Sequence, residues 1–277
     1  SQLSAAPLNH LQHLHDNTDG ASYLSTLFDV AVSPDGKSVY TVSFVENAIT
    51  VLSRDNTSQL LNLTGEITED TTNKTGINGP SGIVVSPDGQ FVYVLGLEPG
   101  FGNVTADEAI SVFRRDPDTG ALTMTQLYKG RGLERPAHME ISADGNNIYV
   151  AGMNTGAITV LKRASNGIIS EQQYQTKLVE PFPGATGNES PYDTTLALSP
   201  DQQHLYIAIS QRSSVPYGGI ISHFSRDPAT GNLTYADQLD YTQPNLEGFR
   251  EFQSLRVSPD GKFLYAAANT YSTSGPS

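Results

Sequence analysis

The chain has 277 residues, 37% of them hydrophobic and 16% charged, and its 29 acidic residues against 16 Lys and Arg give a formal net charge of −13. This length accommodates one large β domain, and the acidic balance without a basic cluster disfavours nucleic acid or an anionic membrane as a partner. The absence of cysteine excludes disulfides and thiolate sites, and no apolar run approaches the ~18 residues of a membrane span, so membrane insertion is not expected.

The first patterned segment is LNHLQHLHD, residues 8–16. Its leucines are spaced by three, as on a helix, but the segment falls where the outer strand of a repeating unit is due. We therefore predict a fourth strand of that unit over residues 8–15. The histidines of the segment would alternate along its exposed edge: His10, His13 and His15.

An eleven-residue segment, VSPDGKSVYTV (32–42), then recurs four more times. The copies are VSPDGQFVYVL (85–95), ISADGNNIYVA (141–151), LSPDQQHLYIA (198–208) and VSPDGKFLYAA (257–267). Their equivalent aspartates lie 53, 56, 57 and 59 residues apart: Asp35, Asp88, Asp144, Asp201 and Asp260. Such a period indicates a repeat architecture. Alternating apolar residues on both sides of a Pro-Asp-Gly turn predict two antiparallel strands, and the turn itself is expected to be structural.

After each hairpin comes a third apolar run, a Gly-containing turn and a fourth, more polar run. The clearest cases are ISVFRRDPDTGALTMTQLY (110–128) and ISHFSRDPATGNLTYADQL (221–239), with shorter versions at 49–67 and 158–176. Four antiparallel strands in a unit of this length predict a blade of a β-propeller. The most apolar strands should lie nearest the axis.

The predicted fold class is therefore all-β, a single β-propeller domain over residues 1–277 with four complete four-stranded antiparallel blades and a partial fifth. The blades are expected near residues 28–68, 82–128, 137–176, 193–239 and 252–277, the last completed in part by 8–15. Because third strands occur only four times, either the ring has five blades and lacks one strand, or it belongs to a larger ring. We favour the larger ring, in which residues 8–15 and 263–267 do not share a sheet.

The long connections between strands form the face where binding or catalysis is expected. Two of these loops are rich in oxygen ligands and are candidates for Ca²⁺, although neither has the closing Glu of a twelve-residue calcium loop: Asp16 with Asp19, and Asp107 with Glu108. Other side chains on this face are candidate contacts for a carbohydrate-like ligand or a protein partner: Tyr192, Asp193, Arg212 and Tyr217.

A candidate catalytic group lies at the start of the third blade. Hydrolysis of an acyl bond, for example, needs a base or metal to activate water and a cationic or hydrogen-bonding group for the oxyanion. His138 and Glu140 are two apart and share a strand face, with Arg135 just before them. Arg250 and Glu251 could supply a second charged pair. The alternatives are that His138 only lines the channel and that Arg250 and Glu251 form a solvated salt bridge.

The segments SRDPATGNLT (225–234), SPDGKFLY (258–265) and RPAHMEIS (135–142) resemble the lactonase-type propeller family, of the 6-phosphogluconolactonase and carboxymuconate cyclase kind, and YVTN-type surface propellers. This resemblance implies a seven-bladed ring with a site of His, Glu, Asp and Arg at the axial mouth. The match to the site is partial. Where the family has Pro-His-x-His, this chain has only the second His, as His138. Ser254 stands near the position at which the family has a Glu.

Two functions remain open. The leading hypothesis is a binding or scaffolding propeller of an exported bacterial protein, extracellular or periplasmic and attached to the cell surface, with further blades or domains in a longer parent chain. The alternative is a lactonase-type hydrolase that opens a sugar or muconate lactone at the axial mouth. No cofactor is required by either hypothesis, apart from the candidate Ca²⁺.

Overall fold

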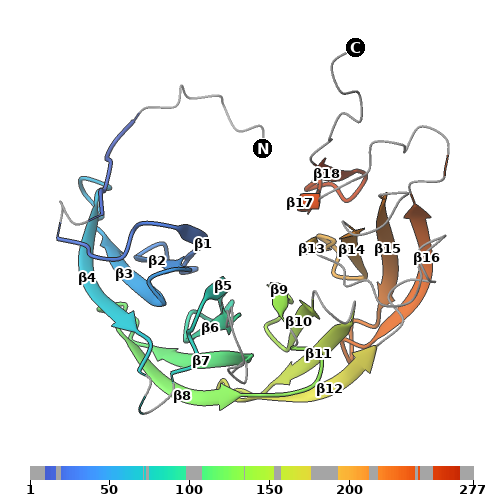
Figure 1. The fold of residues 1–277 in the computed structure, drawn as a ribbon, viewed down its shortest axis with the longest axis horizontal. Helices are drawn as coiled ribbons and strands as arrows, with labels where there is room; N and C mark the ends of the chain where they lie inside the picture. Colours follow the sequence, from blue (N-terminus) through green and yellow to red (C-terminus); the bar gives the residue numbers. More distant parts are fainter. Residues whose placement is uncertain are drawn as a thin grey trace.

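The computed structural model describes residues 10–16, 20–70, 72, 75–97, 108–133, 135–152, 157–175, 193–211, 218–240, 243 and 252–268. The secondary structure of these residues is entirely β. Five sheets follow one another around an open arc, with the first strand of each sheet innermost and, in the four four-stranded sheets, the fourth strand outermost (Figure 1). The predicted fold class is therefore confirmed: the chain is an all-β propeller built from four-stranded antiparallel blades.

Blade 1 consists of β1 (Leu27–Val32), β2 (Ser38–Ser43), β3 (Ala48–Arg54) and β4 (Leu61–Thr68). Blade 2 consists of β5 (Pro80–Val85), β6 (Phe91–Gly96), β7 (Ala109–Arg115) and β8 (Leu122–Tyr128). Blade 3 consists of β9 (Pro136–Ile141), β10 (Asn147–Gly152), β11 (Ile158–Arg163) and β12 (Ile169–Gln175). Blade 4 consists of β13 (Asp193–Leu198), β14 (His204–Gln211), β15 (Gly218–Arg226) and β16 (Leu233–Asp240), and blade 5 of β17 (Phe252–Val257) and β18 (Leu264–Ala268).

The repeated turn forms because its polar side chains bond to their own backbone. In blade 1 the Asp35 carboxylate accepts hydrogen bonds from the Ser33 hydroxyl and from Lys37 N–H. Gly36 adopts a φ of 67°, which glycine reaches without a steric penalty. The hairpin then pairs β1 and β2 antiparallel from Val32 and Val39 outward.

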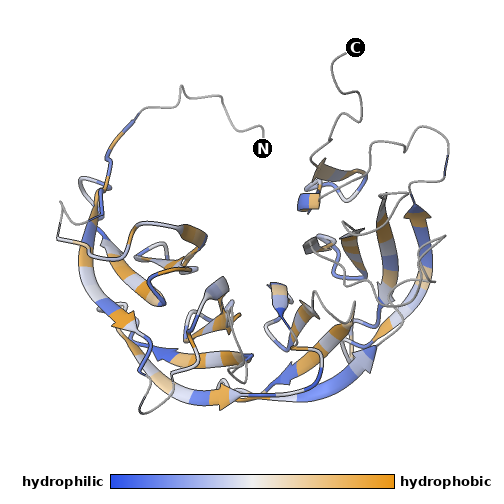
Figure 2. Cartoon of the chain, in the orientation of Figure 1, coloured by the Kyte–Doolittle hydropathy of each residue, from blue (hydrophilic) through white to orange (hydrophobic). Residues whose placement is uncertain are grey.

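The core lies between neighbouring blades, where the two middle strands of the four-stranded sheets are largely buried. Strands β6, β10 and β11 bury nearly every residue, whereas the outer strand β8 alternates half-buried and exposed residues. Figure 2 shows this as apolar middle strands inside a more polar outer rim. Because each apolar cluster joins two consecutive blades, burial stabilises the junctions and not single blades.

The first three junctions each contain a buried arginine as well, which we call the blade clamp. Between blades 1 and 2, Arg115 Nε donates to the Tyr40 hydroxyl at 3.0 Å, Nη2 to Asp35 at 3.0 Å, and Nη1 to the Gly89 carbonyl at 3.1 Å. The Tyr40 hydroxyl in turn donates to the Gly120 carbonyl at 2.9 Å.

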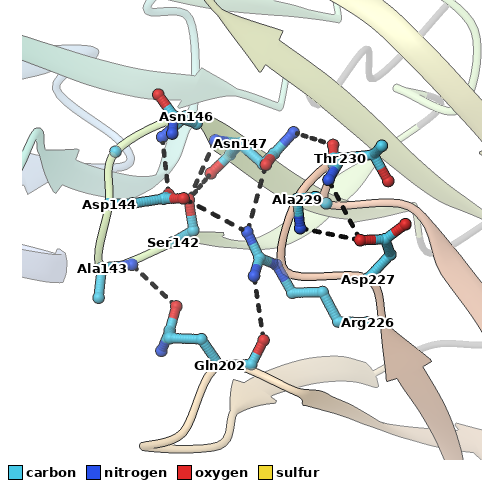
Figure 3. A network of polar contacts seen from close by, with 12 residues as sticks. Ser142, Ala143, Asp144, Asn146, Asn147, Gln202, Arg226, Asp227, Ala229 and Thr230 are labelled. Carbon is cyan, nitrogen blue, oxygen red and sulfur yellow. Dashed lines mark hydrogen bonds and ion pairs between the residues drawn. The ribbon is translucent and has the colours of Figure 1, made fainter.

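The same contacts recur at the next two junctions. Arg163 bonds Tyr93 and Asp88. Arg226 bonds Tyr149. Figure 3 shows the Arg226 guanidinium beside Asp144, and the two groups are 3.9 Å apart. The Pro-Asp-Gly turn is therefore structural, as predicted, and its Asp holds the following blade.

Residues 10–15 do not form the fourth strand that we expected, and residues 8 and 9 lie outside the described part. The Gln12 side chain instead bonds both backbone groups of Leu61 at the start of β4, with Nε2 donating at 2.9 Å and Oε1 accepting at 2.7 Å. The two hydrogen bonds of the Gln12 side-chain amide thus take the place of strand pairing at Leu61. Within the described residues, β18 pairs only with β17, so 10–15 and 264–268 do not share a sheet.

The arc is open between blade 1 and blade 5 (Figure 1), and large apolar side chains are exposed on both sides of the opening. They are Leu27, Phe28, Val30, Val32 and Val45 on blade 1, and Phe263 and Tyr265 on blade 5. Among the described residues there is no helix long and apolar enough to cross a membrane.

Candidate functional site

The first strands of the five blades stand side by side around the axis and line a cavity of about 470 Å³. The repeated serine of the turn sets the register between them. Four residues before that serine, the blades carry Asp29, Gly82, His138, Thr195 and Ser254. Two residues before it they carry Ala31, Val84, Glu140, Ala197 and Arg256. Alternation along a strand turns both sets toward the axis, so polar groups far apart in the sequence share one cavity.

His138 of β9 is held as a neutral hydrogen-bond donor. Leu196 N–H of blade 4 donates to His138 Nδ1 at 2.9 Å, so Nδ1 carries no proton and Nε2 does. Burial, with a smaller contribution from Arg256, lowers the pKa of His138 to about 4. His138 can therefore donate from Nε2 at neutral pH, but in this arrangement it cannot act as a general base.

Glu140, on the same face of β9, is a titratable group with a pKa close to neutral pH. Burial raises its pKa to about 7, the nearby Arg256 guanidinium opposes the rise, and the Asp29 carboxylate adds to it. Arg256 Nη1 lies 3.9 Å from Glu140 Oε1, and their side chains are 64% and 30% exposed. A carboxyl group with this pKa is present in both protonation states at pH 7, as a general acid–base requires.

Asp29 links the first two blades at the cavity wall. Its carboxylate accepts hydrogen bonds from Val30 N–H at 2.8 Å and from Ile83 N–H of blade 2 at 2.9 Å. Burial nevertheless raises the pKa of Asp29, because the hydrogen bonds and the Arg256 charge only partly offset it. Asp29 and His138 thus each accept a backbone N–H from the following blade and reinforce the wall.

Arg135 lies at the rim of the cavity in a strained backbone conformation. Its φ is 52°, in the left-handed region that residues other than glycine rarely adopt. Its N–H donates to the Glu108 carboxylate at 2.6 Å, and Pro136 begins β9 immediately after it. Strain of this kind costs about 1–3 kcal/mol and gathers at functional sites. On the neighbouring strand β13, the buried Thr194 hydroxyl has no hydrogen-bond partner among the described residues.

The structure brings together three of the predicted site residues. Arg135 and His138 line the cavity, and Glu140 lies beside Arg256, which also lines it. Residues Asp19, Asp107, Tyr192, Arg212, Tyr217, Arg250 and Glu251 lie outside the described residues, and so does the side chain of Asp193. Of the candidate calcium ligands that are described, Asp16 accepts from Leu24 N–H and Glu108 from Arg135 N–H. No cluster of three metal-ligating side chains occurs among the residues described.

Sequence reasoning missed Asp29, Thr194 and Arg256. The signal that could have found them was the register of the repeat, because aligning the five first strands on their turn serine puts Asp29 level with His138 and Arg256 level with Glu140. Ser254, near a family Glu, does line the cavity.

The comparisons with known proteins agree with this architecture. A family model described as "Lactonase, 7-bladed beta-propeller" matches residues 29–185. Among curated relatives, 6-phosphogluconolactonases of Klebsiella pneumoniae and of an Enterobacter species are each 25% identical over 69% of this chain. The chain spans 64% of the length of these relatives.

Solved structures show the same fold at lower identity. A Bacteroides fragilis protein assigned as a 6-phosphogluconolactonase superimposes with a TM-score of 0.59 at 23% identity, over 84% of this chain and 61% of its own. The Pseudomonas aeruginosa periplasmic gluconolactonase gives a TM-score of 0.52 at 17% identity, over 86% of this chain and 77% of its own.

Proposed function

The chain belongs to the lactonase family of seven-bladed β-propellers, and from this premise we propose that it hydrolyses a lactone in the cavity between its first strands. The observation that carries the proposal is Glu140, a carboxyl group with a pKa of about 7 beside an arginine and a neutral histidine donor. A perturbed carboxyl pKa beside a charge partner in a cavity marks a candidate catalytic group, and this favours a hydrolase over our leading hypothesis from sequence, a binding or scaffolding propeller. The relatives also favour the hydrolase.

The proposed reaction uses two groups that line the cavity, His138 and Arg256, and Glu140 beside Arg256. The Glu140 carboxylate takes a proton from water as the water oxygen attacks the lactone carbonyl carbon. His138 Nε2–H and the Arg256 guanidinium donate to the oxyanion that forms on the carbonyl oxygen. Protonated Glu140 then returns the proton to the ring oxygen as the acyl–oxygen bond breaks, and the product is an open-chain hydroxy acid.

The charges around the cavity support an anionic sugar lactone as substrate. Arg135 and Arg256 lie on its lining from different blades, and guanidinium groups bind phosphate or carboxylate in a bidentate manner. The unpartnered Thr194 hydroxyl supplies a further donor or acceptor for a sugar hydroxyl. A phosphorylated gluconolactone, the substrate class in the names of the relatives, has these features.

The test is turnover of phosphorylated and unphosphorylated sugar lactones, corrected for spontaneous hydrolysis at each pH. Glu140→Gln should lower kcat by about 10²–10⁴-fold, the usual contribution of a general acid–base. Arg135→Gln should raise KM for the phosphorylated lactone more than for the neutral one. Glu171→Gln, on the outer strand β12 away from the cavity, is the matched control and should retain full activity.

Wild-type activity that equals background hydrolysis on every lactone would reject the proposal. Full activity of Glu140→Gln would keep a lactonase but reject the assigned base.

A further inference from the structure

Asp29 is a buried carboxylate that two backbone groups hold in the cavity wall. Its Oδ1 accepts from Val30 N–H at 2.8 Å, and its Oδ2 accepts from Ile83 N–H at 2.9 Å. The two donors belong to the adjacent inner strands β1 and β5, so both carboxylate oxygens are fixed by the sheets. An ionised carboxylate accepts about four hydrogen bonds. Each oxygen of Asp29 therefore keeps room for one further donor, and the residue lines the cavity.

The fold itself does not require a carboxylate at this position. The equivalent residues of the other blades are Gly82, His138, Thr195 and Ser254. Asp29 forms no ion pair with a described residue, and Arg256 acts on it only as a nearby charge. Burial therefore raises the pKa of Asp29 despite its two hydrogen bonds. A buried carboxylate without an ionic partner costs free energy, and such a group in a cavity is a candidate for binding a ligand.

Glycine in the next blade keeps the space beside this carboxylate open. A Cβ at Gly82 would lie 3.9 Å from Asp29 Oδ2 and 3.2 Å from Leu95 Cδ1. The φ of Gly82 is not in the left-handed region, so its backbone conformation does not require glycine. The missing side chain therefore matters for space, because any larger residue at this position would crowd Asp29 Oδ2.

Other polar groups at the level of Asp29 face the cavity without a partner. The Thr195 and Ser254 hydroxyls line it and form no hydrogen bond with another described residue. His138 also lines it, and its Nε2–H has no acceptor in the described part of the chain. Four blades thus contribute one hydrogen-bonding group each, spread around the axis at one level. Unpaired donors and acceptors arranged in this way fit a ligand with several hydroxyl groups.

We propose that Asp29 binds a vicinal diol of the substrate, with each carboxylate oxygen accepting from one of two neighbouring hydroxyls. The inference rests on the proposed function, which places the lactone carbonyl at His138 on the same level of the cavity. Hydrogen bonds to an ionised group are about twice as strong as neutral ones, so Asp29 dominates the selection, and Thr195 and Ser254 bond the remaining hydroxyls. A lactone without hydroxyls leaves these groups buried and unpaired, and the site rejects it. Asp29 is thus a specificity-determining residue for polyhydroxylated lactones.

The kinetic test compares two uncharged lactones, so that binding of an anion by arginine does not enter the comparison. Glucono-δ-lactone carries vicinal hydroxyls, and δ-valerolactone has the same ring size without them. The deciding quantity is the ratio of kcat/KM for glucono-δ-lactone to kcat/KM for δ-valerolactone, each corrected for spontaneous hydrolysis. Asp29→Asn should lower this ratio by about 10–100-fold, which corresponds to the loss of one hydrogen bond to a charged group.

Two further variants separate selection from folding. Ser254→Ala removes a hydroxyl that bonds no described residue, so it leaves the fold intact and should lower the ratio by about two- to tenfold. Asp118→Asn changes an exposed carboxylate in the turn between β7 and β8 and should leave the ratio unchanged. General damage to the fold, or loss of a group that acts on the carbonyl, lowers kcat/KM for both lactones and does not change the ratio.

Binding is measured separately with glucono-δ-lactam, a stable amide analogue, by isothermal titration calorimetry. The wild type should bind it, and Asp29→Asn should weaken binding by about tenfold or more. An unchanged kinetic ratio, or equal affinity of wild type and Asp29→Asn for the lactam, would overturn the inference, while turnover by the wild type would keep the proposed function. If the wild type hydrolyses neither lactone, the proposed function fails and the lactam decides alone. Weaker binding by Asp29→Asn then supports the diol site, and equal or absent binding rejects it.

Discussion

The blade clamp can be tested at the junction of blades 1 and 2, where Arg115→Met removes the guanidinium and keeps much of the apolar stem. The Arg115 side chain is 1% exposed and bonds Asp35, Tyr40 and the Gly89 carbonyl. Removing one partner of a buried pair leaves the others unsatisfied, at a cost of about 3–5 kcal/mol. In a chain of this size, with an unfolding entropy of about 2.1 cal/mol/K per residue, that cost should lower the melting temperature by roughly 5–9 °C.

Arg114→Met is the matched control, because Arg114 is its exposed neighbour on the same strand. Surface substitutions of this kind stay within about 0.5 kcal/mol. Urea unfolding and thermal melts of the two variants and the wild type give the comparison directly. Equal decreases in the free energy of unfolding for Arg114→Met and Arg115→Met would refute the clamp as a source of stability.

The pH dependence provides an independent check of the same contact. Burial opposes ionisation of Asp35, but hydrogen bonds from Ser33, Lys37 and Arg115 prevail and lower its pKa to about 2. A depressed carboxyl pKa stabilises the fold above the unfolded value near 4 and loses that contribution as pH falls toward 2. The stability gap between wild type and Arg115→Met should therefore narrow between pH 4 and pH 2, and a constant gap would contradict the assignment.

Three further outcomes are expected. Glu140→Gln should raise the melting temperature at pH 8 and leave it unchanged near pH 4.5. The reason is that a carboxyl group with a raised pKa lowers the free energy of unfolding as pH rises through about 7. An equal effect at both pH values would argue against the buried carboxyl. Gly231→Ala should destabilise far more than Gly261→Ala in thermal melts, because a Cβ at Gly231 would lie 2.1 Å from Asn147 and one at Gly261 would meet nothing within 4 Å. Millimolar Ca²⁺ should raise the melting temperature more than NaCl of equal ionic strength if the acidic loops bind it, and equal shifts would leave only screening.

The blade architecture could be predicted because the residues that form each hairpin are close together in the sequence of every repeat. The Pro-Asp-Gly turn of residues 34–36 and the alternating strands around it define a hairpin without reference to any distant residue. The clamp could not be predicted in the same way, although Tyr40 and Arg115 both recur with the period. A cross-blade contact between them appears only when one blade is placed against the next.

The site was predicted in part for a related reason. His138 and Glu140 are neighbours on one strand, so their pairing is visible in the sequence. Asp29 and Arg256 reach the same cavity from the two ends of the arc, and only the shared register of β1, β9 and β17 brings them near. The neutral state of His138 also depends on a backbone N–H donated by a different blade.

Every clamp arginine contacts an aspartate of the preceding blade, so each blade is clamped by residues that come later in the chain. The aspartate and its arginine are 80 residues apart at the first junction and 75 at the second. At ribosomal rates of about 5–20 residues per second, a blade waits roughly 4–16 s for its arginine to be synthesised. During that interval the Asp and Tyr face of the newest blade stands open to water, to chaperones and to the matching strand of another nascent chain.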